Sequence, residues 1–300
     1  MNGCLHNYFR VGIVNFMAFP APYSVVDATT KTASDAFFGA IEVTRVANPD
    51  ERAQVAKILA ASHLAVGYGA QPVLLGNRLD LNSLDESKRN EAVAEMLACV
   101  DEAQFLGCSR FAVLSGPDPG PAQRAAATEA LVRSLLEICA YASQRGRMGV
   151  TLEVFDREID KKALIGSTAD AVAVATAVRE RFPSFGLMVD LSHLPLQGET
   201  ARDALTVAKD HLVHVHIGNC SLQKGNPAYG DLHPRFGIAG GEVDVAEVRE
   251  FLRVLLQIGY IGEGKRNIVA FEVKPMSVEE PPEVVIANAK RTLMEAWAGV

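Results

Sequence analysis

Four apolar runs of the sequence each end on a carboxylate or an imidazole, and these side chains could together bind a metal ion. They are, in chain order, Glu153, Asp190, His216 and Glu272. Carboxylate oxygens and imidazole nitrogens are ordinary ligands of divalent cations, and no thiolate accompanies them here. Three carboxylates held close together would repel one another unless a cation lay between them. The pattern therefore predicts a site for one divalent ion, for which we expect Mn²⁺, with Mg²⁺, Co²⁺ and Zn²⁺ as alternatives.

The neighbours of each of these residues indicate that it lies in a strand and points inward. Leu152 and Val154 flank Glu153, and the other three polar residues have apolar neighbours in the same way. Successive side chains of a strand point to opposite faces, so the apolar pair can pack on helices while the polar residue faces the other side. His214 shares the face of His216 one layer deeper, and we interpret it as a core or supporting histidine.

Strand-like and helix-like segments alternate along the whole chain, which predicts a single α/β domain over residues 1–300. The predicted strands are 10–16, 40–46, 64–68 continuing toward 75, 110–114, 149–155, 186–191, 212–217 and 267–273. The predicted helices are 49–62, 87–106, 121–144, 168–181, 201–210, 245–258 and 282–297. Eight strands alternating with helices favour a (β/α)₈ TIM barrel over a doubly wound open sheet. In such a barrel the functional residues lie at the C-terminal ends of the strands.

Composition and charge argue against several classes of function. The chain has 29 Lys and Arg residues against 36 Asp and Glu residues, and a net charge of −7, so no basic surface for nucleic acid is expected. Its five cysteines are scattered without a CxxC pair, which favours reduced thiols in a cytoplasmic protein. The N-terminal residues lack the apolar core of a secretory signal, and no run approaches the length of a membrane span. We therefore expect a cytoplasmic protein that acts on a small molecule.

The four strand ends, read together, resemble the xylose-isomerase-like barrel superfamily. The matching segments are GVTLEVF, GLMVDLSH, LVHVHIGN and NIVAFEVKP, and they contain the four residues named above. That superfamily includes sugar isomerases, keto-sugar 3-epimerases, inosose dehydratases and the endonuclease IV repair enzymes. The resemblance implies that Glu153, Asp190, His216 and Glu272 are the metal ligands. It also implies that His193, in the Asp-x-x-His of the second segment, contacts the substrate or a second metal ion.

The resemblance implies a metal-dependent sugar isomerase or epimerase. In that branch the metal holds a sugar carbonyl and a neighbouring hydroxyl, one glutamate removes the proton next to the carbonyl, and the other returns it. A metal stabilises the charge that develops on oxygen, and a carboxylate can serve as the base. Glu153 and Glu272 would be the two catalytic glutamates, in either order, and His193 would assist them. The substrate would be a keto- or oxo-sugar.

The loop after His216 departs from the epimerase pattern. The arginine that those enzymes carry a few residues later is missing at 222–224, and Arg235 comes further along. Asp231 and His233, with His193, resemble one metal site of endonuclease IV, which makes a phosphodiesterase an alternative. The histidines that the repair enzymes need after their third and fourth strands are absent. We expect His193, Asp231, His233 and Arg235 to bind the substrate or a second metal ion.

The C-terminal half also resembles the catalytic subunits of bacterial C-glycoside deglycosidases. Those are metal-dependent lyases of 3-oxo-glycosides that work with a small partner subunit. The resemblance implies the same proton abstraction, followed by elimination, with His193 or His233 as an acid or base toward the leaving group. A homo-oligomer, with or without a small second subunit, is expected from the superfamily. A barrel that has kept its metal only for stability is the non-catalytic alternative.

Overall fold

The computed structural model describes residues 3–146 and 148–300 and consists of strands and helices in regular alternation. The strands are β1 (Arg10–Ile13), β2 (Ala40–Val43), β3 (Ala65–Gly69), β4 (Arg110–Leu114), β5 (Gly149–Glu153), β6 (Gly186–Asp190), β7 (Leu212–Gly218) and β8 (Ile268–Glu272). The helices are η1 (Leu5–Asn7, 3₁₀), α1 (Asn15–Ala18), α2 (Val25–Ala33), α3 (Pro49–Ser62), α4 (Gln71–Gly76), α5 (Glu86–Phe105), α6 (Arg124–Ser143), α7 (Thr168–Arg179), α8 (His193–Gln197), α9 (Ala201–Ala208), α10 (Val245–Gln257) and α11 (Pro282–Ala298). Within the described residues no helix is long and apolar enough to cross a membrane.

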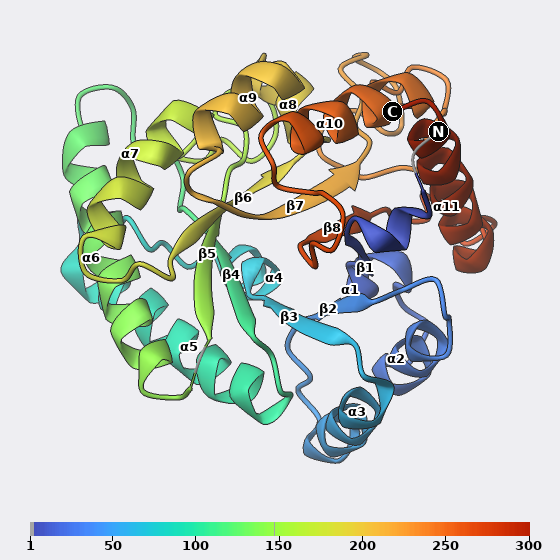
Figure 1. Cartoon of the computed structure of the whole chain (residues 1–300). Coiled ribbons are helices and arrows are strands. Elements are labelled where there is room, and N and C mark those ends of the chain that lie inside the picture. The colour runs from blue at the N-terminus through green and yellow to red at the C-terminus, as the bar shows by residue number, and fades with distance from the viewer. Residues whose placement is uncertain (1–2, 147) are drawn as a thin grey trace.

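The strands form one parallel barrel that the longer helices surround (Figure 1). Hydrogen bonds join the eight strands in the order β1-β8-β7-β6-β5-β4-β3-β2. The remaining gap, between β1 and β2, is closed by a parallel bridge between Val14 and Glu42 and by the Gly39 N–H, which donates to the Val11 carbonyl at 2.8 Å. The predicted TIM barrel is confirmed, and the open-sheet alternative is wrong.

Several helices begin at a side-chain cap, as their sequences indicate. Ser167 and Thr200 accept N–H groups of the first turns of α7 and α9. Asp244 and Glu247 form a reciprocal capping box at the start of α10. These caps satisfy donors that the helix itself leaves unpaired, which fixes where each helix starts.

Two predicted strands extend too far, because short helices follow β1 and β3. The prediction of strand up to residue 16 is wrong after Ile13, since α1 begins at Asn15. The continuation of the third strand toward residue 75 is also wrong, because α4 occupies Gln71–Gly76. Pro72 lies in the first turn of α4, where its fixed φ and missing N–H suit a helix. Both helices border the C-terminal end of the barrel.

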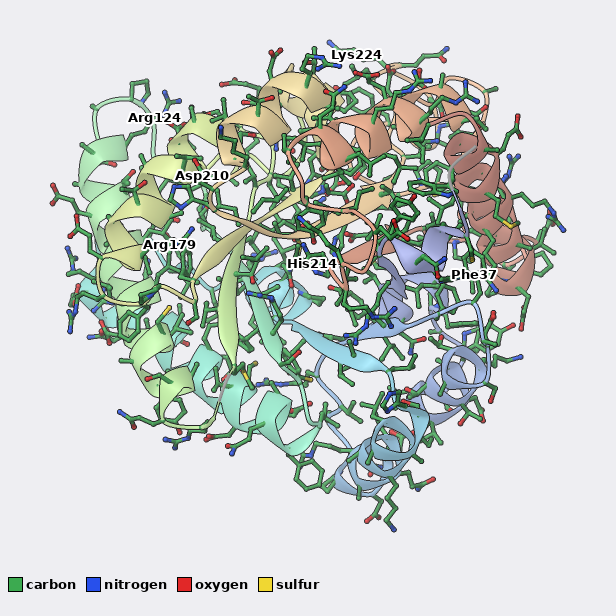
Figure 2. The ribbon with its side chains drawn as sticks, viewed as in Figure 1. Phe37, Arg124, Arg179, Asp210, His214 and Lys224 are labelled. Atoms are coloured by element: carbon green, nitrogen blue, oxygen red, sulfur yellow. The ribbon has the colours of Figure 1, made fainter. Side chains whose placement is uncertain are left out.

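The interior of the barrel holds polar side chains where small residues leave room for them. Figure 2 shows His214 at the centre of the molecule, whereas Arg124 and Lys224 lie at its periphery. A Cβ atom on residue 67 would lie only 3.1 Å from Cγ of Glu42, so Gly67 makes room for that inward-pointing glutamate. The alternation predicted from the sequence therefore holds, with apolar residues toward the helices and polar residues toward the barrel axis.

Strand register decides which polar residues become neighbours. The pairing of β6 with β7 shifts between Leu187 and Met188, an irregularity that places Asp190 opposite His216. A bulge of this kind moves the following side chains along the partner strand. Two of the four predicted ligands thus lie side by side at the same level of the barrel.

A residue on the outer face of β5 allows core packing to be tested without changing the polar residues inside the barrel. Leu152 is fully buried on the helix side, next to Glu153 on the inner side. We expect Leu152→Ala to lower the free energy of unfolding by about 2–5 kcal/mol, because it leaves a cavity in the core. Urea denaturation checks this, with Val284→Ala, at a position 58% exposed, as a control that should change by less than about 0.5 kcal/mol. Equal effects of the two substitutions would contradict the assignment of Leu152 to the core.

Candidate metal centre

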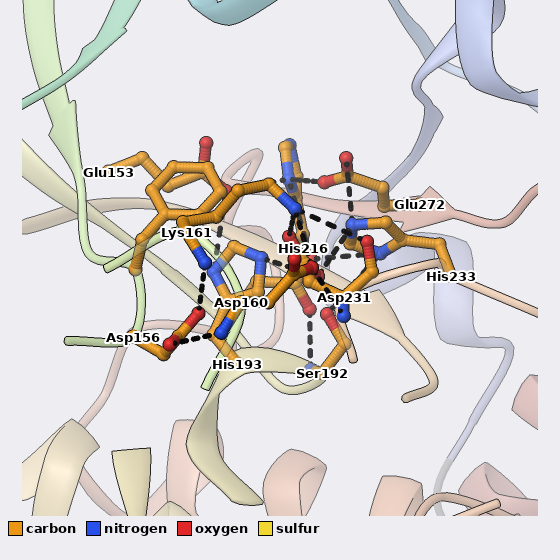
Figure 3. Close-up of polar contacts among 12 residues, drawn as sticks. Glu153, Asp156, Asp160, Lys161, Ser192, His193, His216, Asp231, His233 and Glu272 are labelled. Atoms are coloured by element: carbon orange, nitrogen blue, oxygen red, sulfur yellow. Dashed lines mark hydrogen bonds and ion pairs between the residues drawn. The ribbon is translucent and has the colours of Figure 1, made fainter. Parts of the chain in front are cut away.

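The four predicted ligands meet at the C-terminal end of the barrel. One donor atom from each of Glu153, Asp190, His216 and Glu272 lies within 4.8 Å of the others. The first three side chains are buried, and that of Glu272 is 13% exposed. Figure 3 shows Glu153, His216 and Glu272 in a polar network with residues of the loops after β5, β6 and β7. The sequence prediction that they converge is confirmed; their role as ligands stays a prediction.

The surrounding chain holds each of two carboxylates by one oxygen and leaves the other free. The backbone N–H of Ser192 donates to Oδ1 of Asp190 at 2.7 Å, and Nε2 of Gln71 donates to Oε2 of Glu153 at 2.7 Å. Oδ2 of Asp190 and Oε1 of Glu153 are buried without a hydrogen bond, and Oε2 of Glu272 lies 2.6 Å from Nδ1 of His216. The free oxygens are thus oriented by their partners and directed at a common point.

Glu42 of β2 orients the histidine of this group, and the sequence analysis missed it. Nε2 of His216 donates to the Glu42 carboxylate at 3.0 Å, and Nε2 of His214 donates to it at 2.8 Å. This arrangement keeps a proton on Nε2 of the His216 ring and directs Nδ1 toward the three carboxylates. A polar residue inside the apolar run AIEV was the available signal for Glu42. The sequence analysis also missed Gln71, because it wrongly predicted that the third strand continues through this residue.

The four donor atoms form a set that fits a divalent cation. Oε1 of Glu153 and Oδ2 of Asp190 are buried without a hydrogen bond, although native proteins satisfy most buried polar atoms, and Nδ1 of His216 lies 2.6 Å from Oε2 of Glu272. Burial, with the nearby Glu272 charge, raises the pKa of Asp190 to about 6 despite the histidines near it. Burial also opposes ionisation of Glu272, but His233 and His216 outweigh it and lower its pKa to about 2. A cation at this point would relieve the repulsion between the carboxylates.

A second cluster lies beside the first and contains three of the four other polar residues singled out from the sequence. Oδ1 of Asp231 lies 3.2 Å from Nε2 of His193 and 2.9 Å from Nε2 of His233. All three side chains are buried, and Nδ1 of His193 donates to the Val154 carbonyl at 2.9 Å. Burial disfavours protonation of His233, but Asp231 and Glu272 outweigh it and raise its pKa to about 9. The cluster is ready to exchange protons or to bind a cation.

A cavity of about 250 Å³ opens onto both clusters. Its polar lining consists of Glu42, Gln71, Glu153, Lys161, His216, Asp231, His233 and Glu272. Its apolar lining comes largely from α1, α4 and Phe155. The lining, which combines apolar side chains with a few convergent polar groups, is typical of a small-molecule site.

Two of the predicted substrate contacts lie outside this cavity. Arg235 is 41% exposed and its Nε lies 3.4 Å from Oε1 of Glu280, away from the lining residues. His193 lies behind Asp231, with its ring 4.4 Å from that of Phe155. Lys161, in contrast, lines the cavity, and the sequence carried no signal for it because it lies in a loop without a recognisable pattern.

Comparisons with known proteins agree with this architecture. A family model described as xylose isomerase-like TIM barrel matches residues 31–294. No curated protein matches the chain. A D-allulose 3-epimerase from Methylomonas sp. superposes with a TM-score of 0.71 at 20% identity, covering 96% of this chain and 98% of that one.

Two other solved structures share the fold at similar identity. The IOLI protein, with a zinc atom, superposes with a TM-score of 0.73 at 15% identity, covering 96% of this chain and 98% of that one. A 3-keto-D-glucoside 4-epimerase from E. coli, in its apo form, superposes with a TM-score of 0.68 at 16% identity, covering 95% of this chain and 99% of that one. At these identities the likeness shows the fold.

The buried histidines predict how stability changes with pH in metal-free protein. The folded-state pKa of His233, about 9, exceeds the ordinary value of 6.5, so its stabilising charge is complete below pH 6.5 and lost as the pH rises through 9. We expect the free energy of unfolding to fall over this interval, by a few kcal/mol (~1.4 kcal/mol per pKa unit). Urea denaturation in EDTA across this range measures the slope, and His233→Gln should reduce it. A free energy of unfolding that does not change with pH over this range would contradict the raised pKa of His233.

The Glu42–His216 hydrogen bond predicts a loss of metal affinity when it is weakened. Glu42→Gln keeps the shape of the side chain but removes the charge that favours the Nε2–H form of His216. We expect affinity for Mn²⁺ or Zn²⁺ to fall about 10–100-fold. Equilibrium dialysis measures this. Glu102→Gln is the control, since Glu102 is similarly buried and accepts the N–H of Val46 at 2.7 Å, far from the centre. Equal affinities of the two variants would count against a positioning role for Glu42.

Proposed function

Because the chain belongs to the xylose isomerase-like TIM barrel family, we propose that it is a metal-dependent isomerase or epimerase of a keto- or oxo-sugar. The observation that carries this proposal is the convergence of four buried donor atoms, three from carboxylates and one from an imidazole, on one side of a cavity. The shared fold with a D-allulose 3-epimerase and a 3-keto-D-glucoside 4-epimerase supports the same reaction class.

The metal ligands in this proposal are Glu153, Asp190, His216 and Glu272. A divalent cation held by them would supply Lewis-acid chemistry that polarises a sugar carbonyl. We propose Mn²⁺ because three of the four donors are carboxylates, with Mg²⁺, Co²⁺ and Zn²⁺ as alternatives. The zinc atom of the IOLI structure supports a divalent ion in this fold.

Glu153 and Glu272 carry the proton transfer in this proposal. Both line the cavity, from β5 and β8, so a sugar bound in the cavity would present a C–H bond to either carboxylate. One carboxylate takes the proton next to the carbonyl, and the other returns it, on the same or a neighbouring carbon.

The second cluster binds and orients the sugar. Asp231 and His233 line the cavity and present polar atoms for sugar hydroxyls, or for a second ion, while His193 acts through Asp231. Gln71 holds Glu153 by its outer oxygen and fixes the direction of the other one. The apolar wall from α1 and α4 limits water around the reacting carbon, which strengthens the electrostatic interactions there.

Exchange of the proton next to the carbonyl tests the proposed reaction. Metal-loaded protein in D₂O should incorporate deuterium into a keto-hexose or a 3-oxo-glucoside. NMR of the sugar measures the rate of this incorporation. We expect Glu153→Gln to reduce the rate by 10²–10⁴-fold, as the loss of a general base does, and EDTA to abolish it. Glu180→Gln, at an exposed position at the end of α7, is the control. Exchange that persists in Glu153→Gln would refute its role, and release of an aglycone would indicate a lyase instead.

A further inference from the structure

The second cluster has the composition of a cation site of its own. His193, Asp231 and His233 bring two imidazoles and a carboxylate to one point, and His193, His233 and Asp190 also place donor atoms within 4.8 Å of one another. Nε2 of His193 and Oδ1 of Asp231 are buried, and their polar contacts are with each other and with His233. Two imidazoles and a carboxylate are a common ligand set for Zn²⁺. The residues alone would therefore predict a second ion here.

The chain already places a positive charge at this cluster. Nζ of Lys161 lies 2.8 Å from Oδ2 of Asp231 and 3.0 Å from Oδ2 of Asp160, and it lies 3.4 Å from the Asp231 carbonyl oxygen. The Lys161 side chain is only 21% exposed. Its ammonium group thus fills the outer side of Asp231, while the two histidines occupy the inner side.

The loop that carries Lys161 is anchored so that the ammonium stays in place. The carboxylate of Asp156, itself 1% exposed, accepts the backbone N–H groups of Ile159, Asp160 and Lys161 at 2.6, 2.8 and 2.9 Å. The side chain of Asp160 in turn accepts the N–H of Asp231 at 2.8 Å, which ties the loop after β5 to the loop after β7. Figure 3 shows these contacts between the two loops. Lys161 is therefore held against Asp231 rather than left free in solvent.

We propose that Lys161 takes the place of a second metal ion at the His193–Asp231–His233 cluster, so that the protein binds a single ion at the first centre. The inference rests on the proposed metal centre. A dication on Oδ1 of Asp231 would stand a few ångströms from the ammonium and close to the first ion, in surroundings where like charges repel strongly. The single carboxylate of Asp231 is already neutralised by Lys161. The cluster then remains free of metal, and its histidines and Asp231 are available to bind the substrate.

The stoichiometry of bound metal tests this proposal without measuring activity. Protein stripped with EDTA is loaded with Zn²⁺ alone, passed over a desalting column, and its zinc content is measured by elemental mass spectrometry. We expect one ion in the wild-type chain and two in Lys161→Met. Lys162→Met is the matched control, because Lys162 is the next residue and is exposed, and it should bind one ion. The double variant Lys161→Met with Asp231→Asn should return to one.

Two ions in the wild-type chain, one in Lys161→Met, or two in Lys162→Met would overturn the proposal. No ion in the folded wild-type chain would instead remove the proposed centre at Glu153, Asp190, His216 and Glu272. Circular dichroism confirms that each variant is folded. Lys161→Gln replaces Lys161→Met if that variant does not fold, and Lys161→Arg, which keeps the charge, should bind one ion.

Discussion

Burial of several carboxylates at one end of the barrel is the constraint on which the rest of the site depends. Glu153, Asp190 and Glu272 approach one another where little water can screen their charges, and Glu42 and Asp231 lie close by. Such a group is stable only if positive charge compensates it. The structure provides compensation from protonated histidines and from Lys161, and it leaves donor atoms directed at a point that suits a cation.

The support of this group comes from elements spread over the whole barrel. Glu42 on β2 holds His216 of β7, Gln71 on α4 holds Glu153 of β5, and the backbone at Ser192 holds Asp190. These partners set the direction of each donor atom before any ligand binds, so little reorganisation is needed on binding. Glu42 also joins His214, so a residue of the barrel core contributes to the geometry of the site.

The short helices after β1 and β3 show where local patterns mislead. The apolar residues of α4 suggested an extended strand, but Pro72 in the first turn and the burial of Val73 and Leu74 together suit a helix that covers the barrel mouth. The same helix supplies Gln71. A wrong prediction of one element therefore concealed a residue that orients a predicted ligand.

The sequence by itself determined the barrel and the four polar residues at its strand ends, because strand alternation and the order of strands and helices are local or periodic properties. Tertiary structure alone decided which side chains meet across the barrel. Glu42 reaches His216 from a distant strand, the β6–β7 irregularity places Asp190 beside His216, and loop contacts bring Lys161 to Asp231. Contacts of this kind depend on register and loop conformation, which no spacing along the chain encodes.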